Sequence, residues 1–480
     1  MSETNPYQEL LEQLQACESQ EERDWLSLRF SIAQLPKELQ AAVRAAAVPR
    51  FFDRAFLNAL LDHPLDEGQF AELLEQSYIE PYPGKERYNV HERSRRLLQE
   101  KLWQEDELLY REFSGRAFAY CRSQDQKDIT WRIETIYHQL IAEPNKGAIA
   151  LSNTCIDWTK YPSLPSDQAE SLIRAVREHQ DMNRLPEKVA HYFWLNQSRV
   201  HIRCFRHEEA KQSLGKIPLS HVKKDFYLTV SCLEYLGRVH ALFSEFPEAE
   251  LCYEKALSRF RMADNWLGEN FCLLGLAQIY LALFKVNLAR RNLEKVLMRC
   301  RGDQQIKADS FLGLGKVYLV RSNLNKAWSF CNKALKLYKK IGSRLGKANC
   351  YYVISEIYLR RSELLKAQKQ CGEAMSLYSK IDNRGGEANS LRLFGEIEVK
   401  AKNNFFLAQK YYIQASTLFE RIQCWEGVAE CLEGFAELHQ AQGQLQQAAE
   451  YWQKAADKYH ELVMPLRAEQ CLEQLRQMKE

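Results

Sequence analysis

The sequence has no long apolar segment. Its apolar runs all fall short of the roughly 18 consecutive residues that a membrane-spanning helix needs. It also begins with a polar and acidic stretch, MSETNPYQELLEQLQACESQEERDW, which differs from the basic and then apolar pattern of a secretory signal peptide. We therefore expect a cytoplasmic protein without a membrane span.

Paired cysteines are absent as well. The 14 cysteines are scattered singly, without any Cys-x-x-Cys motif. This spacing excludes a zinc ribbon and a dithiol redox motif. We expect reduced, mostly buried thiols and no bound metal.

Catalytic motifs are also missing. The sequence contains no G-x-S-x-G, no H-E-x-x-H and no G-x-x-x-x-G-K-[ST]. The run HEEA from His207 to Ala210 resembles a metal site only superficially, because its alanine belongs to a repeat described below. Glu396 and Glu398 lie two residues apart on an expected helix and point in different directions, so they form no acid–base pair. The sequence predicts no catalytic residue and no cofactor; an enzyme site built without a known motif is the alternative left open.

The sequence also lacks a strong excess of positive or negative charge. The chain has 66 Lys and Arg residues against 63 Asp and Glu residues, which gives a net charge of +3. Such a balance provides no overall attraction to nucleic acid or to an anionic membrane. The second half of the chain offers only pairs of adjacent cations, such as Lys339 and Lys340.

The second half does contain a repeat. The turn-like stretch IGSRLGKAN begins at Ile341, and IDNRGGEAN begins 40 residues later at Ile381. Alignment on this period places a small residue at one position of six repeats, namely Gly237, Ala277, Gly315, Ser355, Gly395 and Ala436. Two more small positions follow in each repeat: first Ala249, Ala289, Ala327, Ala367, Ala408 and Ala448, then Ala256, Val296, Ala334, Ala374, Ala415 and Ala455.

These small residues have a mechanical explanation. Two antiparallel helices approach each other closely only where one of them offers a small side chain. Leucines at helical spacing supply the rest of the apolar stripe. The residues five before the first small position are small too, and they account for four of the cysteines by packing: Cys232, Cys272, Ser310, Cys350, Ser390 and Cys431.

The pattern resembles the longer variant of the tetratricopeptide repeat (TPR), in which a turn similar to GDRxGEA joins successive repeats. Here that turn reads GSRLGKA and DNRGGEA. The resemblance implies a right-handed α-solenoid, and we expect the turn glycines to supply backbone angles that other residues resist. A degenerate seventh repeat is expected around Ser198, His201 and Ala210.

The first hundred residues lack this period. Three helices are expected within LPKELQAAVRAAAV, RAFLNALLD and EGQFAELLEQSY, followed by a β-hairpin over YIEPYPGKERYNVH that turns at Pro83-Gly84. Helix resumes in ERSRRLLQEKLWQED. Three helices and a two-stranded wing indicate a winged-helix domain. It resembles the winged helix of STAND-type signalling ATPases, through Tyr88, His91 and Arg93 followed by RRLL.

The resemblance to these ATPases stops upstream of the winged helix. They carry a P-loop NTPase there, but this sequence has no P-loop motif. In the family, the histidine corresponding to His91 contacts nucleotide; without a phosphate-binding loop we expect His91 to cap or pack the wing. Cations near the wing alternate with acidic residues, so they do not predict a DNA-binding face: Lys85, Arg87, Arg93, Arg95, Arg96 and Lys101.

The sequence thus predicts a mainly α protein with four segments. These are an N-terminal helical segment (1–34), a winged-helix-like domain (35–108), degenerate helical or TPR-like repeats (109–230) and six TPR repeats (231–480).

The first helix of each TPR lines the concave face of such an array. Positions counted from the small residue of each repeat give the predicted partner-binding residues Arg238, Gln278, Lys316, Asn349, Tyr352, Glu356, Asn389, Arg392 and Glu396. Cations and apolar residues lie mostly in the early repeats and acidic residues in the late ones. This order predicts a peptide held in one direction, its basic end toward the C-terminal repeats; an ordinary solvated face is the alternative.

We therefore expect a non-enzymatic scaffold or adaptor that binds a protein or peptide segment in the concave TPR groove. The Lys/Asn set with which some TPR proteins hold a chaperone's C-terminal carboxylate is not evident at these positions. The alternative is a transcriptional or signalling regulator, in which the winged helix contacts DNA and the TPR array senses a ligand. Partner identity and oligomeric state stay open.

Overall fold

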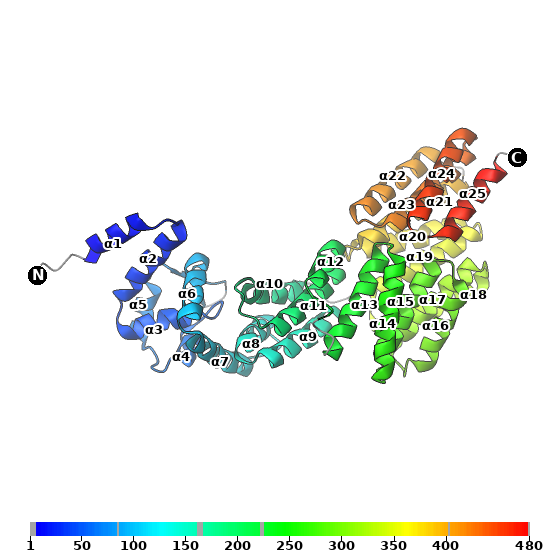
Figure 1. Ribbon diagram of the computed structural model, residues 1–480. Helices are drawn as coiled ribbons and strands as arrows, with labels where there is room; N and C mark the ends of the chain where they lie inside the picture. The colour runs from blue at the N-terminus through cyan, green and yellow to red at the C-terminus, as the bar shows by residue number, and fades with distance from the viewer. Residues whose placement is uncertain (1–5, 84–85, 161–166, 221–224, 402–403, 479–480) are drawn as a thin grey trace, which may run out of the picture. The chain divides into compact units, whose positions relative to one another are not determined.

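A computed structural model describes residues 6–83, 86–160, 167–220, 225–401 and 404–478 (Figure 1). Most of these residues are helical, which confirms the expected mainly α class. The chain forms two compact units. Unit 1 comprises Met1–Thr154 and Asp167–Phe193, and unit 2 comprises Cys155–Ser166 and Trp194–Glu480. No helix in the described ranges is both long and apolar enough to cross a membrane.

Unit 1 starts with five helices, then a hairpin, then further helices. The order is α1 (Pro6–Ala16), α2 (Gln20–Ala33), α3 (Lys37–Ala46), α4 (Arg54–Leu60), α5 (Glu67–Leu74), β1 (Ile79–Pro81), β2 (Tyr88–Val90), α6 (Glu92–Glu105), α7 (Glu107–Ser123), α8 (Ile129–Ala142) and α10 (Asp167–Asp181). The unit boundaries fall within α9 (Pro144–Lys160) and α11 (Glu187–Arg203).

The hairpin forms where the sequence predicts it. Strands β1 and β2 are antiparallel, with Ile79 opposite Val90 and Pro81 opposite Tyr88. Phe52 extends this pairing through a bridge to Tyr88, and the side chains of Phe52 and Val90 are fully buried. Part of the expected turn, Gly84, lies outside the described residues. The helices and strands from α3 to α6 therefore follow one another in the predicted order.

A buried polar network joins α6, α8 and α10 in unit 1. The guanidinium of Arg95 pairs with Glu178 at 2.9 Å and donates to the hydroxyl of Tyr137 at 3.1 Å. His179 is fully buried; its Nε2 lies 3.1 Å from the carbonyl oxygen of Tyr137 and its ring stacks on that tyrosine. Burial lowers the pKa of His179 well below its usual value, and Arg184 lowers it further.

Unit 2 is an array of antiparallel helix pairs. After α12 (His207–Gly215) come α13 (Phe226–Leu242), α14 (Phe246–Met262), α15 (Trp266–Ala282), α16 (Val286–Arg299), α17 (Gln304–Val320), α18 (Leu324–Ile341), α19 (Arg344–Arg360), α20 (Leu364–Ser379), α21 (Arg384–Ala401), α22 (Phe405–Arg421), α23 (Trp425–Ala441), α24 (Leu445–Glu461) and α25 (Pro465–Gln477). Each odd-numbered helix from α13 to α23 packs on the following even-numbered one, and α25 packs on α24. This arrangement confirms a TPR-like solenoid.

The small residues of the repeat lie at the helix contacts, as predicted. In the fourth repeat Ser355, Ala367 and Ala374 are all fully buried. The hydroxyl of Ser355 donates to the carbonyl oxygen of Ala367 on the facing helix at 2.6 Å, so the two backbones are in close contact there. The packing cysteines behave the same way, because Cys272 and Cys350 are buried free thiols.

The expected role of the turn glycines is wrong in part. Gly342 does adopt a left-handed conformation, with φ 75°, but the equivalent residue of the next turn is Asp382 with φ 52°. Gly346 and Gly386 lie inside helices instead, and a Cβ atom at either would overlap the ring of Tyr338 or Tyr378. These two glycines allow close approach of an aromatic ring to the helix that follows it.

A candidate partner-binding groove

The predicted partner-binding residues lie on the first helices of five successive pairs. Arg238 (α13), Gln278 (α15) and Lys316 (α17) are exposed, whereas the remaining six, on α19 and α21, are half-buried. We call the surface formed by these nine residues, together with Glu426, Glu430, Glu433 and Glu437 of α23, the inner wall.

Arg392 is the centre of the inner wall. Its side chain is only 11% exposed and pairs with Glu396 one helical turn away. It also pairs with Glu430 on the next first helix at 3.2 Å and donates to the hydroxyl of Tyr352 on the preceding one at 2.8 Å. Arg392 thus ties α19, α21 and α23 together.

Tyr352 and Glu356 continue this network on α19. The hydroxyl of Tyr352 donates to Glu356 at 3.3 Å. Burial raises the pKa of Glu356 to about 7, although the nearby Arg392 lowers it. Glu356 forms no ion pair with any described residue.

Two of the predicted residues are bound to the fold itself. Asn349 accepts a hydrogen bond of 2.6 Å from the hydroxyl of Tyr378, and Asp309 accepts the equivalent bond of 2.5 Å from Tyr338 in the repeat before. The side-chain amide of Asn389 donates to the carbonyl oxygen of Gly385 at 3.0 Å. The two tyrosine bonds join paired helices, whereas the Asn389 bond lies within α21; Asn349 and Asn389 therefore contribute less free hydrogen-bonding capacity than the sequence predicts.

The inner wall has free cations at one end and free carboxylates at the other. In the described chain, neither Arg238 nor Lys316 forms an ion pair. At the α23 end Glu426 and Glu437 are likewise without one. Burial, together with repulsion by Glu430, raises the pKa of Glu426. The charges that remain free therefore follow the predicted order along the array.

Arg467 on α25 is an inner-wall contact that the sequence reasoning missed. Its guanidinium pairs with Glu433 at 2.8 Å and Glu430 at 3.7 Å, and it stacks over the ring of Tyr459. A shift of 40 residues aligns Arg467 with Gly427, the glycine that lies against the ring of Phe419. A charged residue in place of this glycine is the signal in the sequence that could have revealed it.

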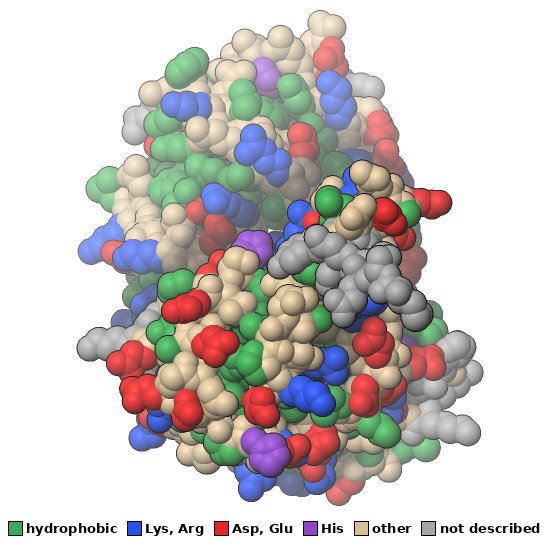
Figure 2. All heavy atoms as spheres, turned by 90° about the vertical axis from the view of Figure 1, so that its left-hand side faces the viewer, with side chains coloured by type: hydrophobic (Ala, Val, Ile, Leu, Met, Phe, Trp, Pro, Cys, Tyr) green, Lys and Arg blue, Asp and Glu red, His purple; other side chains and the backbone are tan. Residues whose placement is uncertain are grey.

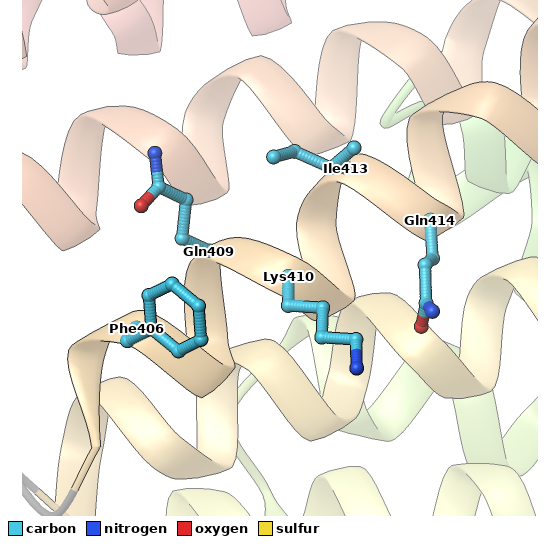
Figure 3. Close-up of a pocket in the computed structure, with 5 residues that line it drawn as sticks. All are labelled: Phe406, Gln409, Lys410, Ile413 and Gln414. Carbon is cyan, nitrogen blue, oxygen red and sulfur yellow. The ribbon is translucent and has the colours of Figure 1, made fainter.

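Two shallow hollows open on the array. One of about 440 Å³ lies at its C-terminal end and is lined by Glu433, Glu437, Gln440, Trp452, Gln470, Cys471 and Gln474. The other, of about 200 Å³, follows the solvent face of α22 (Figure 3), where Phe406, Gln409, Lys410, Ile413 and Gln414 come from a single helix. The second hollow brings no groups together from different elements, so it offers no constellation for chemistry.

The cations near the hairpin are mostly engaged within unit 1. Arg87 stacks over Phe51 at 4.6 Å, Arg93 pairs with Asp24, and Arg95 is committed to Glu178. Acidic and basic side chains are interspersed on the face shown in Figure 2. His91 is exposed at the start of α6, and its side chain makes no capping hydrogen bond, so the expectation that it caps or packs the wing is wrong.

Nothing in the described chain forms a metal centre, since no three His, Cys, Asp or Glu side chains gather in a suitable group. The described cysteines include buried thiols such as Cys371 and Cys431, and burial raises the pKa of each. Thiols of this kind react poorly as nucleophiles.

Comparisons with known proteins identify the fold. The family model of the soluble NSF attachment protein (SNAP) matches residues 303–464, which is less than half of the chain. A search of curated proteins gives no match. A Rap protein crystallised with competence and sporulation factor is similar over 76% of this chain and 97% of its own, at 10% identity and a TM-score of 0.53. A STAND protein with a tetratricopeptide repeat sensor, from Pyrococcus horikoshii, is similar over 98% of this chain and 72% of its own, at 13% identity and a TM-score of 0.52.

Proposed function

We propose that this chain is a non-catalytic interaction protein, which binds an extended segment of a protein or peptide along the inner wall. The observation that carries the proposal is the order of the unpaired charges: Arg238 and Lys316 at one end, Glu356 in the middle and Glu426 at the other end. Concave surfaces of repeat arrays are suited to extended partners. A segment with an acidic end against α13 to α17 and a basic end against α19 to α23 complements this order.

The fold supports the same reading. The Rap protein with a comparable fold was solved with a bound factor, competence and sporulation factor. We propose the repeat array rather than unit 1 as the site of the partner of this chain, because the ordered unpaired charges lie on the inner wall. The resemblance is one of fold, so the chemistry of the partner is taken from the inner wall itself.

We infer that α3 to α6 and the hairpin form a winged-helix-like module with a structural role. A DNA-contacting module needs cations that are free to meet phosphates. Here Arg87, Arg93 and Arg95 are held by aromatic rings or carboxylates of unit 1. This observation favours protein binding over the DNA-binding alternative.

A pair of synthetic peptides tests the proposal. One peptide carries acidic residues in its first half and basic residues in its second; the other has the same composition with alternating charges. We expect the first to bind more tightly in fluorescence anisotropy. The double variant Arg238→Glu and Lys316→Glu should weaken its binding by about 5–30-fold, since each exposed ionic contact contributes about 0.5–1 kcal/mol.

The matched control reverses two exposed lysines on second helices, Lys336→Glu on α18 and Lys369→Glu on α20. It changes the net charge by the same amount and should leave binding unchanged. Equal affinity for both peptides, or equal loss in both double variants, would show that binding depends on overall charge and not on the inner wall.

A further inference from the structure

The last repeats of unit 2 touch the first ones. The hydroxyl of Ser244, in the turn between α13 and α14, accepts a hydrogen bond of 3.3 Å from the backbone amide of Glu426, which is 182 residues away. The guanidinium of Arg467 on α25 lies 5.4 Å from the ring centre of Phe284, in the turn between α15 and α16. The red end of the array accordingly lies beside its green beginning in Figure 1.

This contact is packed as well as polar. One cluster of buried residues runs from α13–α17, with members such as Leu276 and Ile279, into α23–α25, with members such as Tyr459 and Met464. The middle repeats form smaller clusters of their own, for example the one around Tyr338 and Ile354. Unit 2 therefore has a continuous apolar contact between its two ends.

Phe284 lies in the turn between the two helices of its repeat. It adopts φ 56°, a left-handed conformation that bulky residues rarely take. The equivalent turn residues in other repeats are Phe205 (φ 57°), Ser244 (φ 63°), Ser322 (φ 58°), Ser362 (φ 60°) and Gly443 (φ 77°), so the left-handed angle is common to the turns of the repeat. Phe284 differs from the serines at this position in its ring, which lies against the guanidinium of Arg467.

Arg467 connects this contact to the inner wall. The same guanidinium that lies over Phe284 pairs with Glu433 and Glu430. Glu430 is shared with Arg392, the centre of the inner wall. A cationic group bound at Glu430 and Glu433 competes with Arg467 for the two carboxylates, and so weakens the hold of Arg467 on Phe284.

We propose that the contacts of Phe284 with Arg467 and of Ser244 with Glu426 form a latch, which closes the inner wall and opens to admit a bound segment. The claim that the latch opens to admit a segment rests on the proposed function, whereas the claim that the latch exists does not. Closing the latch and binding the segment oppose each other, because Arg467 and the segment compete for the carboxylates of Glu430 and Glu433. By thermodynamic linkage, a loosened latch raises the affinity for the segment as much as the bound segment loosens the latch.

The amide of Glu426 is a direct probe of the latch. It lies in the first turn of α23, where backbone N–H groups have no acceptor within the helix, and Ser244 on the opposite side of the contact supplies one. Hydrogen exchange at this amide, measured without any peptide, therefore reports latch opening.

The test variant is Phe284→Ser, because serine occupies the equivalent turn of neighbouring repeats at a similar φ. We expect exchange at the Glu426 amide to rise at least tenfold, with the helix content unchanged. Ser244→Ala should give the same effect and serves if Phe284→Ser fails to fold. The control is Phe406→Ser, the same change at a 77% exposed aromatic away from the latch, which should leave this amide unaffected.

The admission step is tested with the charge-segregated peptide described above. Its association rate should be higher for Phe284→Ser than for the wild type and for Phe406→Ser. An unprotected Glu426 amide in the wild type, no change in Phe284→Ser, or the same change in Phe406→Ser would each overturn the latch. A faster-exchanging amide with an unchanged association rate would overturn admission alone, and failure of the peptide to bind any form would refute the proposed function while leaving the latch result intact.

Discussion

Glu356 shows how one carboxylate of the inner wall responds to pH. Burial raises its pKa to about 7, whereas a glutamate in an unfolded chain has a pKa of about 4.3. Between these values the folded state holds a proton that the unfolded state has lost. The stability gained from this proton is complete below about pH 4.3 and is lost as the pH rises through about 7.

Glu356→Gln should therefore stabilise the protein at pH 8 and have little effect at pH 5. The expected gain at pH 8 is about 1–2 kcal/mol, which discounts the full shift, at about 1.36 kcal/mol per pKa unit, for partial exposure. Urea unfolding at the two pH values measures it. Glu373→Gln, an exposed change on α20, is the control, and an equal effect of Glu356→Gln at both pH values would contradict the assignment.

At the scale of the helix, each first helix from α19 onward begins against an aromatic ring of the helix before it. Gly346 lies against Tyr338, Gly386 against Tyr378 and Gly427 against Phe419. A methyl group at any of these glycines would overlap the ring. The spacing between one repeat and the next thus depends on a hydrogen atom in place of a side chain.

Gly346→Ala should destabilise unit 2 by about 1–3 kcal/mol, because an overpacked contact forces the ring or the helix to move. Gly372→Ala is the matched control. Gly372 lies inside α20 with nothing within 4 Å of the added methyl, so alanine there should stabilise by up to about 1 kcal/mol through helix propensity. Thermal unfolding of the two variants should move in opposite directions, and a shift of both in the same direction would refute the ring contact.

The helices and the contacts between paired helices could be predicted best from the sequence. A small residue recurring every 40 positions, such as Ser355 and Gly395, marks a helix contact in the sequence itself. Ion pairs between helices of different repeats could not be predicted in this way. Arg392 and Glu430 are 38 residues apart, and only the stacking of α21 on α23 brings them together. Arg467 could not be predicted because it stands where other repeats have a glycine, and an alignment of repeats identifies only residues that follow the shared pattern.

At the scale of the whole molecule, the two units carry buried groups with opposite pH responses. In unit 1, burial and the neighbouring Arg184, His138 and Arg95 lower the pKa of His179 well below its usual value. An unfolded histidine takes up a proton near pH 6.5, so the stability of unit 1 falls as the pH drops below about 6.5. In unit 2, the raised pKa of Glu356 makes the stability rise over the same range.

Acidification from pH 7.5 to 5.5 should therefore reduce hydrogen-exchange protection in α8 and increase it in α19, after correction for intrinsic exchange rates. His179→Phe keeps an aromatic ring on Tyr137 but removes the titrating group, so the response of α8 should become flatter. Protection that moves in the same direction in both helices, or a response of α8 unchanged by His179→Phe, would contradict the prediction.

The meeting of the two ends could not be predicted from the sequence. Each repeat adds a small rotation, and whether the last repeat reaches the first depends on the sum of these rotations. No local pattern encodes that sum. A phenylalanine at the turn position of Phe284 does not reveal the contact, because Phe205 occupies the equivalent turn of another repeat; it becomes meaningful only once Arg467 is known to lie beside Phe284.

The contact between Ser244 and Glu426 also changes how the array comes apart. An open row of repeats frays from its termini, because a terminal repeat has one neighbour while an internal one has two. Here the pair α13–α14 packs on α12 and α15 and is held, in addition, by α23. The first and last helix pairs of the array therefore support each other, and we expect the helices of unit 2 to unfold in one cooperative transition.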